Sequence, residues 1–529
     1  MLLVLIFALA LGLRLWGIDF GLGLDYHSDE QFKLKDIIAL LSGHSLEDAL
    51  SYAHPTFMRR FVAVVLHVFT AISTNAPDYE TIHVISRICI ALLGALTVVP
   101  VFLIGKELVS EKLGLLAALV LALVPTHVIH SHYLKEDIPQ TFWLAFFLFF
   151  AIKIIRSGSI TYYAFSGLVG GLALATKYPS AVMVTVPLVA AHILNCRKEK
   201  SLLTGLFASL RDRRLWLAMF TVVLTFAIFS FDALRNIHVF LQGIRYEFSH
   251  AFRGHFGIRI SSLPLFFTYH LRFSLWPGMT PFLLMLSFAG MIAALYLTGK
   301  DRERLEETGW VIFTLLVFYF TVEIPLLKPP GFQRYVIPCV PLLSLFAAWA
   351  FLFFIGNKNM PVKVAGVFIS SLIVFYAGIM SSRYVNEMVP DTRDVAAGWI
   401  EKWMYEDVSP DASIMLFGQY DSNLPYRVIK SRTFSDRISW SSSLDDMLMR
   451  KPDYIVVSSL NYDRYFQYKM YGDRYSMDLE IYYKFYRILF ETHRPVMSFS
   501  SSLPRLGINN PVILVYRVDY EKLKALWTM

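Results

Sequence analysis

Two acidic pairs beside hydrophobic segments are the first candidates for functional residues in this chain. Asp29-Glu30 lies in YHSDE, just after the first hydrophobic segment, and Glu136-Asp137 lies in HYLKED, just before a later one. Carboxylates are unfavourable near a lipid bilayer, so a pair at the mouth of a hydrophobic segment indicates catalysis or transport more than packing. Acidic residues also cap helices, and Asp29-Glu30 alone fits a cap for a helix that begins near Gln31. The second pair favours the functional interpretation.

Basic residues accompany both acidic pairs. Lys135 stands directly before Glu136, and AHPTFMRR after the first pair contains His54, Arg59 and Arg60. Such a cluster at a membrane surface suits the transfer of a sugar from a lipid-linked phosphate. One carboxylate removes the acceptor proton, and cations or a divalent metal hold the departing phosphate. A nearby carboxylate also stabilises an oxocarbenium-like transition state.

The composition shows what must position these residues. Of 529 residues, 56% are hydrophobic and 17% charged. The apolar residues form runs of the roughly 17–25 residues that cross a bilayer. We predict a polytopic α-helical membrane protein with about eleven transmembrane helices. They are expected at 1–18, 84–105, 113–130, 140–155, 162–177, 178–195, 215–231, 279–298, 310–327, 335–355 and 364–381.

Basic loops set the predicted orientation. Lys and Arg gather in 196–214, in 300–304 and around the turn between the second and third spans, which all fall on one face. That face is predicted to be cytoplasmic. The net charge of +8 is explained by these loops, so no nucleic-acid partner is expected. The chain has no Asn-X-Ser/Thr acceptor site, which favours the plasma membrane of a bacterium or archaeon.

Two domains are predicted. Residues 1–381 form the membrane domain, and its external loop 19–83 has amphipathic stretches typical of helices on a membrane surface. In residues 382–529, the β-like runs ASIMLFG, PDYIVVSS and PVILVYRV alternate with helical stretches. That alternation predicts a small extracytoplasmic α/β domain. We expect it to cover the mouth of the site and to recognise the acceptor or act as a lid.

Other charged residues near the external ends of spans have two interpretations. Arg14 either extends to the lipid headgroups or serves the site. Lys177, in the turn KYPS, and Arg334, which starts the tenth span, suit contacts to phosphate. Glu323 is expected to form a structural ion pair with Lys328 or Arg334.

The chain resembles the GT-C-fold glycosyltransferases of the dolichyl-phosphate-mannose protein mannosyltransferase superfamily, which includes the bacterial lipid A aminoarabinose transferases. No single motif carries the resemblance; their order and spacing do. The motifs are HSDE (27–30), HPTF (54–57), HYLKEDIP (132–139), GLVGGLALATKYPS (167–180), RYVIP (334–338) and DTRDVAAGWIEKWM (391–404).

The resemblance implies a polyprenyl-phosphate sugar as donor and an acceptor outside the membrane. It makes Asp29 the candidate general base, with Glu30 as its neighbour and Asp137 as the second acidic site. Lys177 and Arg334 become the candidate donor-phosphate contacts. The other candidate substrate-binding residues are His54, Arg59, Arg60, Lys135 and Tyr335.

A divalent metal is the one cofactor that the motifs suggest. Glu136-Asp137 beside Lys135 is similar to the second acidic motif of metal-dependent oligosaccharyltransferases. Asp29, Glu136 and Asp137 are therefore candidate ligands for Mg or Mn.

A secondary transporter is the alternative function, because intramembrane charges also mark ion pathways. Transporters commonly contain internal repeats and bind their substrate near the middle of the membrane. This sequence shows no repeat, and its charges cluster at one face. These features favour the enzyme.

Overall fold

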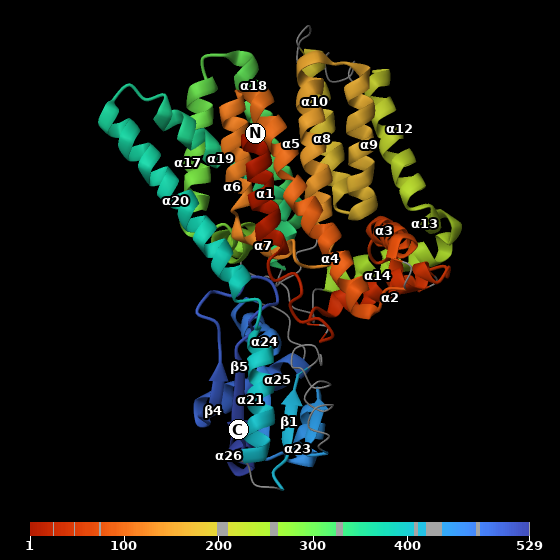
Figure 1. Cartoon of the computed structure of the whole chain (residues 1–529), viewed down its shortest axis with the longest axis vertical. Helices are drawn as coiled ribbons and strands as arrows, with labels where there is room; N and C mark the ends of the chain where they lie inside the picture. The colour runs from red at the N-terminus through yellow and green to blue at the C-terminus, as the bar shows by residue number, and fades with distance from the viewer. Residues whose placement is uncertain are drawn as a thin grey trace.

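The computed structural model describes residues 1–24, 26–46, 48–73, 76–197, 210–253, 263–323, 332–406, 411–418, 436–471 and 477–527. A large bundle of helices carries a smaller domain at one end (Figure 1). The long helix α20 (Met360–Asn386) leads from the bundle into that domain. α20 therefore continues five residues beyond the predicted domain boundary at 381/382.

Every predicted span coincides with helix. These helices are α1 (Leu2–Leu15), α4 (Tyr79–Leu96), α5 (Val98–Leu108), α6 (Glu111–Ala122), α7 (Pro125–His130), α8 (Asp137–Ser157), α9 (Ile160–Thr176), α10 (Ser180–Arg197), α12 (Arg213–Phe229), α17 (Pro281–Thr298), α18 (Arg302–Glu323), η4 (Gln333–Cys339), α19 (Val340–Ile355) and α20. Within the described residues, six stretches are long and apolar enough to cross a membrane: Tyr79–Leu108, Asp137–Ser157, Pro281–Thr298, Arg302–Glu323, Gln333–Ile355 and Met360–Asn386. These stretches confirm the polytopic helical class, and the number eleven stays a prediction.

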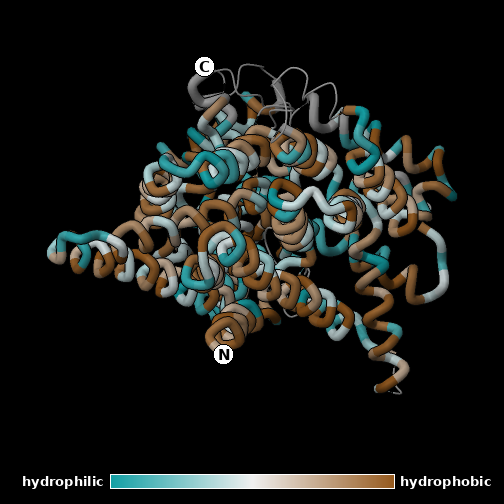
Figure 2. Tube along the Cα trace, turned by 90° about the horizontal axis from the view of Figure 1, so that it is seen from above, coloured by the Kyte–Doolittle hydropathy of each residue, from teal (hydrophilic) through white to brown (hydrophobic). Residues whose placement is uncertain are grey.

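Burial separates the central helices of the bundle from the outer ones. In α19, every residue from Val340 to Phe351 is buried. α12 and α20 instead expose large apolar side chains, among them Phe220, Phe368 and Phe375. Figure 2 shows hydrophobic residues on helices at the periphery, including the N-terminal helix. Apolar surface of this extent is stable when it faces lipid.

The glycine-rich segment 167–180 has a packing role. A Cβ atom on Gly167 would lie 2.5 Å from the Ala218 carbonyl oxygen, and one on Gly171 would lie 2.5 Å from Thr225 Cβ. Only glycine therefore allows α9 to approach α12 this closely, as small residues commonly do between membrane helices. The close contact fixes the end of α9, where Lys177 follows.

Short helices surround the end of the bundle that faces the C-terminal domain. Both amphipathic stretches predicted in loop 19–83 are helices, and these two helices pack against each other. The short helices are α2 (Ser28–Leu41), η1 (Ala49–Tyr52), α3 (Phe57–Ser73), α13 (Phe231–Arg235), α14 (Ile237–Arg253), α15 (Leu263–His270), η3 (Leu271–Leu275) and α16 (Trp276–Gly278).

The C-terminal domain contains a mixed sheet, which confirms the α/β prediction. Its strands are β1 (Ile414–Phe417), β2 (Ile438–Ser441), β3 (Tyr454–Ser458), β4 (Pro495–Phe499) and β5 (Ile513–Arg517). In space they run β2-β1-β3-β5-β4. β1 pairs in parallel with β2 and β3, whereas β5 is antiparallel to β3 and β4. β2 and β4 were not predicted, because serine interrupts the apolar run in β2 and β4 is largely exposed.

Helices cover both faces of this sheet. α21 (Thr392–Glu406) packs on one face, against alternate residues such as Leu416 and Val456. The other face carries Phe417 and Val457 and is covered by four helices. These are α23 (Leu444–Arg450), α24 (Ser459–Tyr471), α25 (Met477–Thr492) and α26 (Tyr520–Trp527).

Candidate active site

Asp29 lies in the first turn of α2, near the end of the bundle. The imidazole of His27 caps this helix by accepting a hydrogen bond from the Asp29 backbone N–H at 3.2 Å. The carboxylate of Asp29 accepts a hydrogen bond from Lys135 and another from Arg334 Nη2 at 3.3 Å. Its side chain is 38% exposed, so a substrate can reach it.

Asp137 begins α8 and is almost fully buried. Lys177 Nζ donates to its Oδ1 at 2.5 Å. Arg334 Nε lies 3.6 Å from its Oδ2. One guanidinium therefore contacts both Asp29 and Asp137, so the two carboxylates lie close together.

Aromatic rings hold the two cations that contact Asp137. Lys177 Nζ lies 4.7 Å from the centre of the Tyr335 ring. The guanidinium of Arg334 lies 4.1 Å from the Phe332 ring and 5.6 Å from the Tyr335 ring. Cation–π contacts of this kind stabilise a desolvated charge. Arg334, Tyr335 and Lys177, three of the predicted substrate-binding residues, thus lie together.

Glu136 faces a different partner from its neighbour Asp137. It accepts a hydrogen bond from Lys33, and both side chains are buried. Burial lowers the pKa of nearby His54 to about 3, so its imidazole is neutral at physiological pH. Lys33 was not singled out from the sequence. Its position four residues after Asp29 in a predicted helix was the available signal.

The cluster carries one excess positive charge. It contains four cations and three carboxylates, which are linked by the ion pairs described above. The residues are Lys33, Lys135, Lys177, Arg334, Asp29, Glu136 and Asp137.

Glu30 has a structural environment, although it is adjacent to Asp29. It is fully buried and accepts from Arg87 Nη2 at 2.7 Å, from Arg87 Nε at 3.1 Å and from the Leu134 backbone N–H at 2.6 Å. His83 Nε2 lies 3.2 Å from the same carboxylate. These partners satisfy the carboxylate of Glu30 and anchor the segment that carries Lys135. The geometry does not favour the predicted catalytic role.

Arg59 and Arg60 do not join the cluster. Arg59 donates to Asp36 and to backbone carbonyls, including that of His54 at 2.8 Å. Arg60 Nε lies 3.3 Å from Asp232, and its guanidinium stacks on Phe231 at 4.4 Å. Both side chains therefore hold loop 19–83 in place, and the structure supports no donor-phosphate contact for either.

The expected pairing of Glu323 with Arg334 is wrong. The Glu323 carboxylate accepts from the backbone N–H groups of Tyr269 at 2.7 Å and His270 at 3.1 Å. Lys328, its other expected partner, lies outside the described residues. Arg14 is fully buried, and its guanidinium donates to Ala10 O at 2.8 Å and lies 2.9 Å from His127 Nδ1. It therefore does not extend to the headgroups.

The proposed metal ligands do not fit a metal site. Asp29, Glu136 and Asp137 each accept a hydrogen bond from a lysine, so the charge that would bind a cation is already neutralised. In the described part of the chain, metal-like spacing is found in another group, His192, Cys196 and Asp212. There, Asp212 is held by Arg214 at 2.6 Å.

The C-terminal domain contacts three of the four chain segments that carry residues of the cluster. Tyr26 donates to Asp394 at 2.5 Å, and its backbone carbonyl accepts from Arg393 at 3.1 Å. Tyr133 donates to Asn509 Oδ1 at 3.0 Å. These two tyrosines precede Asp29 by three residues and Lys135 by two.

The segment that carries Arg334 contacts the loop of the C-terminal domain that contains Asn509. The Gln333 side chain accepts from the Gly507 backbone N–H at 2.9 Å and donates to the Arg505 carbonyl at 3.3 Å. Gln333 directly precedes Arg334. The sequence motifs contain Tyr26 and Tyr133, and Gln333 directly precedes RYVIP, but the sequence gave no indication of their partners.

Comparisons with known proteins agree with the motifs. Residues 62–231 match the family described as dolichyl-phosphate-mannose-protein mannosyltransferase, and this range includes Asp137 and Lys177. The crystal structure of ArnT from Cupriavidus metallidurans bound to undecaprenyl phosphate is similar with a TM-score of 0.52 and 15% identity over 97% of both chains. The apo oligosaccharyltransferase of Archaeoglobus fulgidus is similar with a TM-score of 0.52 and 12% identity, over 96% of this chain and 74% of that one. A search of curated proteins gives no match.

The family match and the shared fold confirm the predicted superfamily, whose proteins are glycosyltransferases. The two solved structures also confirm the GT-C type of membrane fold.

Proposed function

We propose that this chain transfers a sugar from a polyprenyl-phosphate donor to an extracytoplasmic acceptor, with Asp29 as the general base. The observation that carries the proposal is the guanidinium of Arg334 shared by Asp29 and Asp137, next to Lys135 and Lys177. ArnT, which has a similar fold, was crystallised with undecaprenyl phosphate. The single excess positive charge of the cluster matches the single negative charge of a phosphodiester-linked sugar.

The phosphate of the donor competes with the carboxylates for the cations. Arg334 suits this role best because its fork binds phosphate oxygens in pairs, and Lys177 and Lys135 add charge. Burial alone would raise the pKa of Asp29, but Lys135 and Arg334 outweigh it and hold that pKa well below its usual value. When phosphate draws Lys135 and Arg334 away, Asp29 becomes a stronger base.

The transfer step then follows. Asp29 takes the proton from the acceptor nucleophile, which attacks the anomeric carbon as the bond to the phosphate oxygen breaks. Polyprenyl phosphate leaves with the bonding electrons, and the cations stabilise its new charge. Asp137 holds Lys177 and Arg334 in place, and its charge favours the oxocarbenium-like transition state.

Membranes that contain the full chain test this reaction. They are incubated with radiolabelled polyprenyl-phosphate sugars, and the products are labelled acceptor and free polyprenyl phosphate. Asp29→Asn is expected to abolish transfer, whereas Glu80→Gln, which changes an exposed carboxylate in the first turn of α4, is the matched control. Uptake of solute into vesicles without any sugar transfer would instead favour the transporter.

The basic loops support the proposal that the cluster and the C-terminal domain lie outside the cell. Met449 of that domain is 76% exposed, and the Arg302 side chain, in a basic loop, is 80% exposed. A membrane-impermeant maleimide applied to intact cells is expected to label Met449→Cys and to spare Arg302→Cys. The reverse labelling pattern would invert the orientation.

A further inference from the structure

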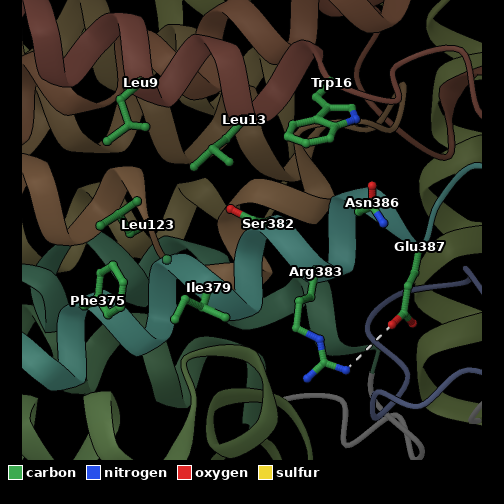
Figure 3. Close-up of a pocket in the computed structure, with 11 residues that line it drawn as sticks. Leu9, Leu13, Trp16, Leu123, Phe375, Ile379, Ser382, Arg383, Asn386 and Glu387 are labelled. Carbon is green, nitrogen blue, oxygen red and sulfur yellow. Dashed lines mark ion pairs between the residues drawn. The ribbon is translucent and has the colours of Figure 1, made fainter.

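A groove on the outside of the bundle lies between α1 and α20 (Figure 3). Its volume is about 610 Å³, and it contains none of the site residues described above. Most of its wall is apolar, and its polar residues gather toward the C-terminal end of α20. The lining residues are Leu9, Leu13, Trp16, Leu123, Phe375, Gly378, Ile379, Ser382, Arg383, Asn386 and Glu387.

The depth of the groove matches one leaflet of a bilayer. A helix rises 1.5 Å per residue, so Phe375 and Glu387 are separated by roughly 18 Å along α20. Half of a hydrocarbon core is about 15 Å. Trp16 lies at the polar end, where aromatic rings commonly mark the headgroup level. The groove therefore fits an acyl chain of the leaflet next to the C-terminal domain, whereas a polyprenyl chain is much longer.

The polar end offers a cation and an anion together. Arg383 Nη2 lies 3.9 Å from Glu387 Oε1, and the two side chains stay 47% and 27% exposed. Arg383 also donates to Ser502 at 2.9 Å, and Ser501 donates to Glu387. Their charges cancel, so this end attracts neither anionic nor cationic headgroups as a class. A headgroup with both charges matches it.

We propose that the groove binds a phospholipid with a zwitterionic, primary-ammonium headgroup, namely phosphatidylethanolamine. Arg383 donates to the phosphate, the ammonium donates to Glu387, and the acyl chain lies against Leu13 and Ile379. An anionic lipid leaves Glu387 facing a second negative charge. This site goes beyond the proposed sugar transfer and does not depend on it.

Lipid retention tests the proposal. The full chain is reconstituted in vesicles of equal parts phosphatidylethanolamine and phosphatidylglycerol, extracted in mild detergent, and weighed with its bound lipid by native mass spectrometry. We expect one phosphatidylethanolamine to be retained in preference to phosphatidylglycerol. Glu387→Gln is expected to reverse that preference, because only the cation remains.

Occlusion of the groove gives a second, independent test. A Cβ atom on Gly378 meets only Leu123 at ordinary contact distance, so Gly378→Phe fills the groove without disturbing the backbone. It is expected to reduce retention at least tenfold. Ile369→Phe, at an exposed position of α20 outside the groove, is expected to retain the lipid. Unchanged retention in Gly378→Phe, equal retention of both lipids, or retained polyprenyl phosphate would each overturn the proposal.

Discussion

At the scale of residues, Arg334 links the two parts of the candidate site. It contacts Asp29 at 3.3 Å and Asp137 at 3.6 Å, and its guanidinium stacks on Phe332. Side chains at the starts of two different helices, α2 and α8, therefore depend on one cation. The same cation is the proposed contact for the donor phosphate.

Replacement of Arg334 is expected to weaken donor binding. Arg334→Ala removes charged hydrogen bonds that contribute roughly 1.5–3 kcal/mol, so the Kd for undecaprenyl phosphate is expected to rise about 10–100-fold. Arg334→Lys keeps the charge but loses the forked guanidinium, so its Kd is expected to lie between those of the wild type and Arg334→Ala. The Kd is measured by titration calorimetry, with Arg302→Ala as the control. An unchanged Kd in a folded Arg334→Ala protein would remove Arg334 from the donor site.

The pH dependence of transfer is expected to report on Asp29. In the free protein the pKa of Asp29 lies well below the usual value. Asp29 therefore stays ionised down to low pH, and kcat/KM, which reports on the free enzyme, is maintained there. With donor bound, phosphate competes for Lys135 and Arg334, and the pKa of Asp29 rises. Activity is lost as pH falls through that pKa, so kcat is expected to decline at a higher pH than kcat/KM does. If kcat and kcat/KM declined at the same acidic pH, phosphate would not compete with Asp29 for Lys135 and Arg334.

At the scale of elements, the first turn of α2 directs two adjacent carboxylates toward different partners. Successive helical residues do not face the same side. Asp29 therefore faces the cluster while Glu30 contacts α4 through Arg87 and His83. Burial alone raises the pKa of Glu30, but Arg87 and His83 outweigh it and hold that pKa well below its usual value. The ion pairs of Glu30 with Arg87 and His83 support the fold, which leaves Asp29 as the proposed base.

Glu30→Gln is expected to destabilise the protein more than it changes the chemistry. Breaking a buried ion pair usually lowers the free energy of unfolding by about 3–5 kcal/mol. Because the folded pKa of Glu30 is below its unfolded value, its contribution is complete above about pH 4.3 and is lost at lower pH. Thermal unfolding between about pH 2 and pH 7 checks both effects. Full stability combined with abolished transfer would instead assign Glu30 to catalysis.

At the scale of the whole molecule, the C-terminal domain positions three site segments together. Its loop 505–510 contacts Gln333 and Tyr133, while Arg393 contacts the backbone of Tyr26. These residues lie one to three positions before Arg334, Lys135 and Asp29. A change in how the domain docks is therefore expected to alter the site without altering its residues.

Gly507→Ala is expected to disturb that docking. Gly507 has a φ of +70°, and a Cβ atom there would lie 2.6 Å from the Tyr133 hydroxyl. The substitution is expected to lower kcat at least tenfold, while circular dichroism stays unchanged. Gly398→Ala, in α21 with open space around it, is the matched control. Equal activity of the two variants would show that transfer does not require this contact.

Local sequence patterns predict the membrane class, the positions of the helices and the α/β character of the C-terminal domain, and the motifs identify Asp29, Asp137, Lys177 and Arg334 as candidates. Hydropathy and periodicity are local properties, so they can be recognised without knowledge of tertiary contacts. The pairings required the folded chain: Arg334 contacts Asp29 and Asp137, Lys33 pairs with Glu136, and Arg59 and Arg60 pair within and beside loop 19–83. Those pairings join segments far apart in the chain, and a charge in the sequence does not specify which opposite charge the packed helices bring beside it.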